Sequence, residues 1–274
     1  MIKSPLSAKL LNRLLSASQN ASIDAGKILK ENMRKDRSVK FKGKVNLVTE
    51  MDLRSEKLIV TRLRKELPSA SFLTEEGSAA ENDSEFKWVI DPLDGTTNYA
   101  HSLPIWCVSI ALEYQGEIVL GCVYDPTRDE LFTATTGLPA KMNGKVISVS
   151  RCGSLNRALL TTGFPYDIRT SRRNNLNYFC DFAVTAQAVR RGGSAALDLC
   201  YVAMGRFDGF WEIKLHPWDT AAGALIVTRA GGRVSTFDGK PFSIYCDNLI
   251  ASNGLIHRQM MKVLQSTRTS KFEY

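Results

Sequence analysis

An apolar stretch that runs directly into two aspartates, a glycine and two threonines places the strongest constraint on how this chain can fold. It reads Trp88-Val89-Ile90-Asp91-Pro92-Leu93-Asp94-Gly95-Thr96-Thr97-Asn98. The first three residues predict a buried strand. Pro92 fixes its own φ and favours an extended Asp91, while Gly95 accepts backbone conformations that other residues avoid. The sequence therefore predicts a core strand that ends in a sharp polar bend.

The polar groups of this segment have the chemistry of a metal and phosphate site. Asp91 and Asp94 can converge across the bend on hard cations, together with a backbone carbonyl such as that of Leu93. The backbone amides of residues 95–97, at an expected helix start, can hold an anion. The same residue types are equally typical of an ordinary turn with a capping threonine. The segment alone leaves both interpretations open.

Further acidic residues occupy positions from which they can reach such a bend. Glu75 and Glu76 follow the apolar residues 71–74, so one of them would sit at the end of a strand. Asp219 lies at the start of an almost wholly apolar helix, and Asp52 heads an amphipathic one. Without context, the glutamates are typical of solvated surface, and both aspartates are typical of helix termini, where the helix dipole favours them.

The remaining pattern predicts two halves of different architecture. Amphipathic helices at 6–33 and after Asp52 precede strands expected at 87–91, 106–114, 118–124 and 130–134, a spacing typical of an antiparallel meander. Strands then alternate with helices, with strands near 158–163, 210–213 and 249–252 and helices near 174–188, 194–204, 217–230 and from 255. We expect an N-terminal α+β subdomain at 1–150 with most of the acidic ligands, a C-terminal α/β subdomain at 151–266, and a loose tail at 267–274.

Composition places the chain among soluble folded proteins. It has 274 residues, 44% hydrophobic and 23% charged, and Lys9, Arg13 and serines interrupt the N-terminal leucines, so neither export nor a membrane span is expected. Six scattered cysteines form no C-x-x-C pair, which favours reduced thiols and a cytoplasmic location. The net charge of +8 would attract both phosphorylated substrates and nucleic acid.

A set of blocks in register resembles the inositol monophosphatase family, and especially its bacterial members, over nearly the whole chain. The blocks are Leu47–Asp52, Thr74–Glu76, Trp88–Asn98, Gly193–Ala196 and His216–Asp219, the last followed by Gly231-Gly232. The resemblance implies a sugar-phosphatase-like sandwich of alternating α-β-α-β-α layers, with an antiparallel sheet in the N-terminal half and a mixed α/β layer in the C-terminal half. It also implies a homodimer and inhibition by lithium.

The resemblance assigns roles to individual residues. It implies that two or three Mg²⁺ ions are bound by Glu75, Asp91, Asp94, Asp219 and the carbonyl of Leu93. Asp52 and Thr96 would handle the nucleophilic water, and substrate would contact Gly95, Thr96, Gly193, Ser194, Ala195 and Glu212. One departure concerns Phe41, which stands where the family often has a lysine, although Lys40, Lys42 and Lys44 are close by. The contact from that loop to phosphate therefore stays unassigned.

Charge balance supports the metal assignment independently. Four carboxylates packed together repel one another, and burying them as bare charges is costly unless cations are present. Four negative ligands and a phosphate dianion match about three divalent ions.

Two alternatives remain open from the sequence. The same chemistry could serve histidinol phosphate, fructose 1,6-bisphosphate or a 3′-phosphonucleotide, although Glu212 would repel a second phosphate and favours a polyol or sugar monophosphate. The basic charge also suits a protein that binds RNA or a transcription complex with a secondary phosphatase activity, although no RNA-recognition motif is found.

Overall fold

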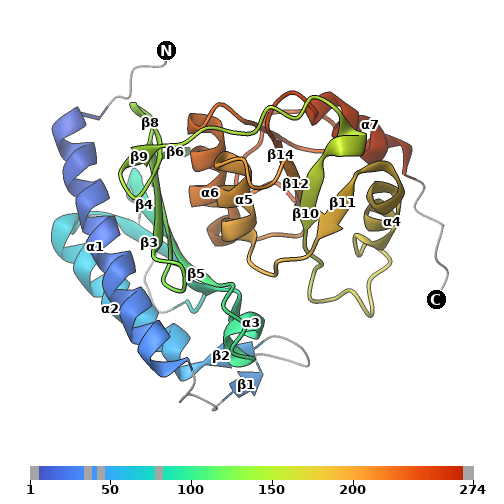
Figure 1. Ribbon diagram of the computed structural model, residues 1–274. Helices are drawn as coiled ribbons and strands as arrows, with labels where there is room; N and C mark the ends of the chain where they lie inside the picture. The colour runs from blue at the N-terminus through green and yellow to red at the C-terminus, as the bar shows by residue number, and fades with distance from the viewer. Residues whose placement is uncertain (1–5, 34–38, 42–46, 78–82, 268–274) are drawn as a thin grey trace.

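The computed structural model describes residues 6–33, 39–41, 47–77 and 83–267. The seven-stranded and five-stranded sheets are separated by helices and covered on their outer faces by further helices (Figure 1). This order confirms the expected α-β-α-β-α layers. Within the described residues, no helix is both long enough and apolar enough to cross a membrane.

The first outer layer consists of α1 (Ala8–Asn32) and α2 (Glu50–Glu66). The Ser7 hydroxyl caps α1 by accepting a hydrogen bond from the backbone N–H of Leu10 at 3.2 Å. The helix buries one stripe of small and apolar side chains against the first sheet, as the three- and four-residue spacing predicts. Both expected helices are thus confirmed, although α2 begins two residues before Asp52.

The first sheet has seven strands in chain order: β3 (Ser71–Thr74), β4 (Phe86–Asp94), β5 (Cys107–Tyr114), β6 (Glu117–Asp125), β7 (Glu130–Thr135), β8 (Leu138–Met142) and β9 (Lys145–Val146). The expected meander is confirmed from β4 to β7. The pairing of β3 with β4 is instead parallel, with Thr74 opposite Ile90. Parallel pairing brings the carboxyl ends of both strands to one edge, so Glu75 leaves β3 beside the polar end of β4.

A separate antiparallel pair joins β1 (Val39–Phe41) to β2 (Leu47–Thr49). The intervening residues 42–46, which include Lys42 and Lys44 of the basic loop, lie outside the described residues.

The second sheet is mixed and has the strand order β11-β10-β12-β14-β13. Its strands are β10 (Leu159–Thr162), β11 (Ala188–Arg190), β12 (Gly209–Ile213), β13 (Arg233–Ser235) and β14 (Asn248–Ser252). The strand β10 runs parallel to both neighbours, whereas β14 is antiparallel to β12 and β13. This arrangement confirms the expected mixed layer of the C-terminal half.

The middle layer is formed by α5 (Ala195–Ala203) and α6 (Pro217–Arg229), which are buried on most sides. Small residues let α6 approach its neighbours closely. A Cβ atom at Gly121 of β6 would lie 2.8 Å from the carbonyl oxygen of Ala222, and one at Gly223 would lie 2.6 Å from Cβ of Leu199. The almost wholly apolar sequence of both helices is explained by this position between two sheets.

The second outer layer consists of α4 (Leu176–Thr185) and α7 (His257–Ser266). The helix expected over 174–188 was placed too long, because residues from Ala188 pair with β10 as the edge strand β11. The short helices α3 (Thr96–Ala100) and η1 (Leu155–Arg157) complete the structure.

The expected division near residue 150 falls between β9 and β10, in the segment that joins the two sheets. Whether the two parts fold as separate subdomains stays a prediction. Of the expected tail, Thr267 hydrogen-bonds to the carbonyl of Val263 at 2.9 Å, and residues 268–274 lie outside the described residues.

Candidate active site

The site begins at the bend that ends β4. The register between β4 and β5 shifts between Asp91 and Asp94, so the strand bulges where it turns polar. Oδ1 of Asp91 accepts a hydrogen bond from the backbone N–H of Leu93 at 2.9 Å, which fixes the turn. Gly95 then adopts a left-handed φ of 94°, and a Cβ there would lie 2.9 Å from the carbonyl oxygen of Ile105. The predicted bend is present, and glycine is required in it for two reasons.

Asp94 connects the bend to the second half of the chain. Its Oδ2 accepts hydrogen bonds from the hydroxyl of Ser194 at 2.7 Å and from the backbone N–H of Ala196 at 2.8 Å. Ser194 is also the N-cap of α5. The amino end of that helix, where backbone N–H groups point outward, therefore meets the carboxylate of the first sheet.

Asp219 lies in the first turn of α6, where its Oδ2 accepts a hydrogen bond from the backbone N–H of His216 at 2.7 Å. This is the N-terminal role that the sequence allowed for. The carboxylate is nonetheless close enough to Asp94 and Glu75 for their charges to raise its pKa, after the larger effect of burial. A capping role and a place in the site are therefore compatible.

The acidic residues share one electrostatic environment. Burial, followed by the charges of Glu75, Asp94 and Asp219, raises the pKa of Asp91 well above its ordinary value. Burial also raises the pKa of Asp94, against the lowering effect of the hydrogen bond from Ser194. Four acidic side chains from β4, α6 and the end of β3 are thus gathered within Coulombic reach, which is the arrangement that needs cations for neutrality.

Asp52 and Thr96 come from two different helices that contact the bend. The hydroxyl of Ser55, one turn after Asp52 on α2, donates a hydrogen bond to the carbonyl of Pro92 at 2.9 Å. Residues three apart share a helix face, so the buried Asp52 lies on the face of α2 that meets the bend. Thr96 opens α3, and its hydroxyl donates to the carbonyl of Leu93 at 3.1 Å.

The loop before α5 is tied to α3. The side-chain amide of Asn98 donates to the carbonyls of Gly192 at 2.9 Å and Ile105 at 2.8 Å. The carbonyl of Gly193 consequently lies within 3.3 Å of the position that a Cβ of Gly95 would take. The structure therefore brings the 193–195 segment against the bend.

Glu212 is buried near the end of β12, with its carboxylate directly against Gly163. A Cβ on Gly163 would collide with both carboxylate oxygens, so only glycine leaves room for them. Burial raises the pKa of Glu212 well above its ordinary value, and the charges of Asp198 and Asp219 add to this rise. Glu212 thus faces the acidic cluster from the second sheet.

Two residues near the cluster were not found by sequence reasoning. Asp198 on α5 is 3% exposed, and its pKa is raised by burial, with the charge of Asp94 adding to the rise. An acidic residue inside an otherwise apolar helix was the available signal. Tyr166 lies in the loop after β10, and no pattern marked it.

The donor set suits Mg²⁺, although no group of three or more His, Cys, Asp or Glu side chains in the described ranges already has the arrangement that holds an ion. Asp91, Asp94 and Asp219 each give an oxygen to protein donors. Because Mg²⁺ typically takes only one or two carboxylates and keeps several waters, a site of shared ligands does not require three converging groups. The side chain of Lys40 is not described.

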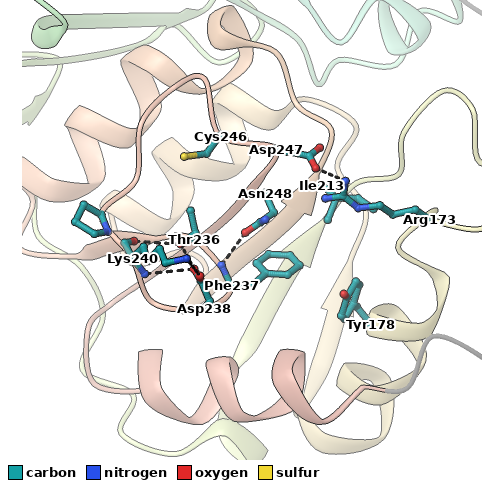
Figure 2. A pocket seen from close by; sticks show the side chains of 11 residues that line it. Arg173, Tyr178, Ile213, Thr236, Phe237, Asp238, Lys240, Cys246, Asp247 and Asn248 are labelled. Carbon is teal, nitrogen blue, oxygen red and sulfur yellow. Dashed lines mark hydrogen bonds and ion pairs between the residues drawn. The ribbon is translucent and has the colours of Figure 1, made fainter.

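Figure 2 shows a separate cavity of about 500 Å³ on the second half. None of the expected site residues lines it. Its four charged side chains form two ion pairs, one between Arg173 and Asp247 and one between Lys240 and Asp238. The ring centroids of Tyr178 and Phe237 are 5.3 Å apart. This cavity lacks the gathered acidic groups of the site at the bend.

Comparison with known proteins gives matches along the whole of this architecture. A model of the inositol monophosphatase family matches residues 10–271. An inositol-1-monophosphatase from Synechocystis sp. is 43% identical over 259 residues, which are 94% of this chain and 90% of the relative. The Nus factor SuhB of Escherichia coli is 40% identical over 254 residues, or 92% of this chain and 95% of the relative. The solved inositol monophosphatase from Anabaena has a TM-score of 0.87 at 40% identity, covering 95% of this chain and 98% of that one.

Proposed function

The chain belongs to the inositol monophosphatase family and is a phosphoric monoester hydrolase, and from this we propose that it hydrolyses inositol 1-phosphate or a similar polyol or sugar monophosphate with Mg²⁺. One observation carries the proposal: Glu75, Asp91, Asp94 and Asp219 lie within Coulombic reach of one another, and Asp91 and Asp94 are buried. Such a cluster is stable as an ionised group only beside cations.

Glu75, Asp91, Asp94, Asp219 and the carbonyl of Leu93 would hold the metal ions. Bound Mg²⁺ would supply positive charge to the phosphate and lower the pKa of a nearby water. The backbone amides of Gly95 and Thr96 lie at the start of α3, directly after Asp94 in the chain, and would be suited to hold a phosphate oxygen.

Asp52 and Thr96 would prepare the water. Since the hydroxyl hydrogen of Thr96 is directed to the carbonyl of Leu93, its oxygen lone pairs are left to accept a hydrogen bond from water. Asp52 takes the proton as the water oxygen bonds to phosphorus, the bond from phosphorus to the alcohol oxygen breaks, and the alcohol leaves with a proton from solvent. No side chain becomes phosphorylated in this scheme.

Gly193, Ser194, Ala195 and Glu212 would contact the alcohol part of the substrate. Glu212 lies on the second sheet, whereas Glu75, Asp91 and Asp94 come from the first, which supports a role away from the phosphate. A carboxylate there accepts hydrogen bonds from substrate hydroxyl groups, and its negative charge repels a second phosphate. This charge argument supports a monophosphate over a bisphosphate.

The test is phosphate release from inositol 1-phosphate, histidinol phosphate, fructose 1,6-bisphosphate and a 3′,5′-bisphosphonucleoside, with and without Mg²⁺, beside the variant Asp94→Asn. We expect Mg²⁺-dependent turnover that is fastest for inositol 1-phosphate and is lost in the variant. Faster turnover of another substrate would contradict the substrate class, and turnover independent of Mg²⁺ would contradict the mechanism. In the variant Glu212→Gln, the difference in turnover between inositol 1-phosphate and the bisphosphates should become smaller.

A second role, in a transcription complex, is supported by the net charge of +8, which would attract nucleic acid, and some of the similar proteins carry the name Nus factor SuhB. Binding of RNA through this charge would weaken steeply as salt rises. A gel-shift series from low to high salt tests the idea, and binding that is absent at low salt would contradict it. The homodimer, lithium inhibition and cytoplasmic location stay predictions.

A further inference from the structure

The loop of residues 163–175 leaves the carboxyl end of β10, at the lower edge of the second sheet in Figure 1. Buried Asn175 closes its base by donating to the carbonyl of Gly163 at 2.5 Å and to the hydroxyl of Thr162 at 2.9 Å. The indole N–H of Trp211, next to Glu212 on β12, donates to Asn175 at 2.9 Å. Both ends of the loop are therefore fixed beside the strand that carries Glu212.

The part of the loop after residue 165 is a compact hydrogen-bonded turn. The backbone N–H of Ile168 donates to the carbonyl of Pro165 at 3.0 Å, and those of Thr170 and Ser171 donate to the carbonyl of Asp167 at 2.9 Å. These hydrogen bonds hold the backbone on both sides of Tyr166, which lies between Pro165 and Asp167.

Lys214 ties this turn to the end of β12. Its ammonium group contacts the carboxylate of Asp167 at 2.6 Å and the hydroxyl of Ser171 at 2.8 Å. Lys214 has a left-handed φ of 60°, a conformation that costs free energy for a lysine and that turns the chain directly after Glu212 and Ile213. The far end of the loop is fixed as well, by the ion pair of Arg173 with Asp247 that Figure 2 shows.

Tyr166 lies between these anchors, three residues after Gly163, which touches the Glu212 carboxylate, and directly before Asp167. Its side chain is among the exposed large apolar groups, at 51% exposure. Burial raises the pKa of its hydroxyl, and the charges of Glu75, Asp94 and Asp219 raise it further. Tyr166 thus stands between two contacts to the end of β12, one at the Glu212 carboxylate and one at Lys214, while half of its side chain is open to solvent.

We propose that Tyr166 is a specificity-determining residue that forms the outer wall of the site for a ring-shaped polyol. Its ring packs on the C–H face of the substrate, and its hydroxyl donates a hydrogen bond to a substrate hydroxyl. Glu212 accepts hydrogen bonds from other hydroxyl groups of the same substrate. A cyclic polyol has both a flat apolar face and a rim of hydroxyls, so it satisfies both residues, whereas a short open-chain alcohol cannot reach both. This inference rests on the proposed function.

The test compares kcat/KM for inositol 1-phosphate with kcat/KM for glycerol 2-phosphate at saturating Mg²⁺. We expect Tyr166→Ala to lower the ratio of the two values roughly 10-fold by removing both contacts. Tyr166→Phe keeps the ring and loses one hydrogen bond, so the ratio should fall by about 3-fold. The matched control is Tyr245→Ala, since Tyr245 is 54% exposed and hydrogen-bonds to Glu113 instead.

The outcomes separate the two levels of the argument. If the wild type prefers inositol 1-phosphate and the ratio of the two kcat/KM values is the same in Tyr166→Ala and Tyr245→Ala, Tyr166 does not form a wall of the site. The proposed function then still stands. A wild type with no preference between the two substrates would also contradict the wall alone, whereas a wild type that hydrolyses neither substrate with Mg²⁺ would mean that the proposed function itself fails. Unchanged melting temperatures in all three variants would show that a lower ratio does not come from unfolding.

Discussion

The bend after β4 and the loop after β10 enter the same site in contrasting ways. The bend spans only a few residues, and hydrogen bonds from both halves of the chain fix it at Asp91 and Asp94. The loop of residues 163–175 is longer, and although buried hydrogen bonds of Asn175 close its base, exposed ion pairs tie its outer part. Buried hydrogen bonds to charged groups stabilise more than exposed ion pairs do. The short bend is therefore suited to chemistry that tolerates no displacement, and the loop to selectivity that differs between related enzymes.

The largest effect should come from Gly95→Ala. A Cβ would strain the left-handed backbone and meet the carbonyl of Ile105, which displaces the amides and carboxylates of the bend. We expect a loss of kcat of about 100-fold, the size that small displacements in active sites produce. Steady-state kinetics measures it.

Its control is Gly116→Ala, which has a φ of 85° but no atom within 4 Å of the new Cβ. This variant carries the same kind of backbone strain at a hairpin far from the bend. If both variants lose equal activity, general instability rather than the bend is responsible.

A smaller effect is expected from Gly163→Ala at the start of the loop. The new methyl group would displace the carboxylate of Glu212, so kcat/KM for inositol 1-phosphate should fall by roughly 10-fold. Activity on glycerol 2-phosphate should change less. Gly153→Ala adds the same methyl group in open space and should leave both values unchanged. Equal losses on both substrates would mean that Glu212 does not distinguish them.

Loosening the loop should have a modest effect. Asp167→Asn weakens the contact with Lys214, and since exposed ion pairs contribute up to about 1 kcal/mol, the preference for inositol 1-phosphate should drop no more than about 5-fold. Asp238→Asn breaks a similar exposed pair with Lys240 on the separate cavity and is the matched control. A loss as large as that of Gly95→Ala would contradict the contrast between loop and bend.

The smallest effect on activity, with a clear effect on stability, is expected at His257. Its buried ring contacts the hydroxyls of Ser235 and Ser252, each at 2.9 Å, and burial, followed by the charge of Arg233, lowers its pKa to about 4 from 6.5. The unfolded chain therefore binds more protons between these values. The free energy of unfolding should fall as the pH drops from 6.5 to 4.

Melting curves across this pH range provide the measurement. In His257→Gln the acid-induced loss should be smaller, although the variant starts less stable at neutral pH because its hydrogen bonds are altered. The exposed His101 provides the control variant His101→Gln, which should follow the wild type. Parallel curves for wild type and His257→Gln would contradict the assignment.

The bend was predictable because local chemistry alone defines it. Apolar residues followed by Asp, Pro, Asp and Gly specify a strand, a turn and a left-handed position without reference to the rest of the chain. The parallel pairing of β3 with β4 was not predictable, since it depends on which strands become neighbours. The predicted length of α4 was wrong for the same reason, because pairing with β10 decides where the helix gives way to β11.

The residues missed at the site depend on distant contacts. Asp198 stands out as an acidic residue in an apolar helix, but its nearness to Asp94 depends on the packing of α5. Tyr166 looks like an ordinary loop tyrosine until Lys214 fixes the turn beside it. The assigned role of Ser194 stays a prediction, and the structure adds that its hydroxyl donates to Asp94. A sequence pattern does not predict which side chains of one half contact the other half.

The hydrogen bond between Asp94 and Ser194 joins residues that are 100 positions apart in the chain. During synthesis, Asp94 leaves the ribosome roughly 5 to 20 seconds before its partner does, at ordinary elongation rates. Through that interval the acidic bend has neither the amino end of α5 nor Asp219 beside it. A nascent or truncated first half therefore carries an incomplete acidic cluster, which only the last third of the polypeptide completes.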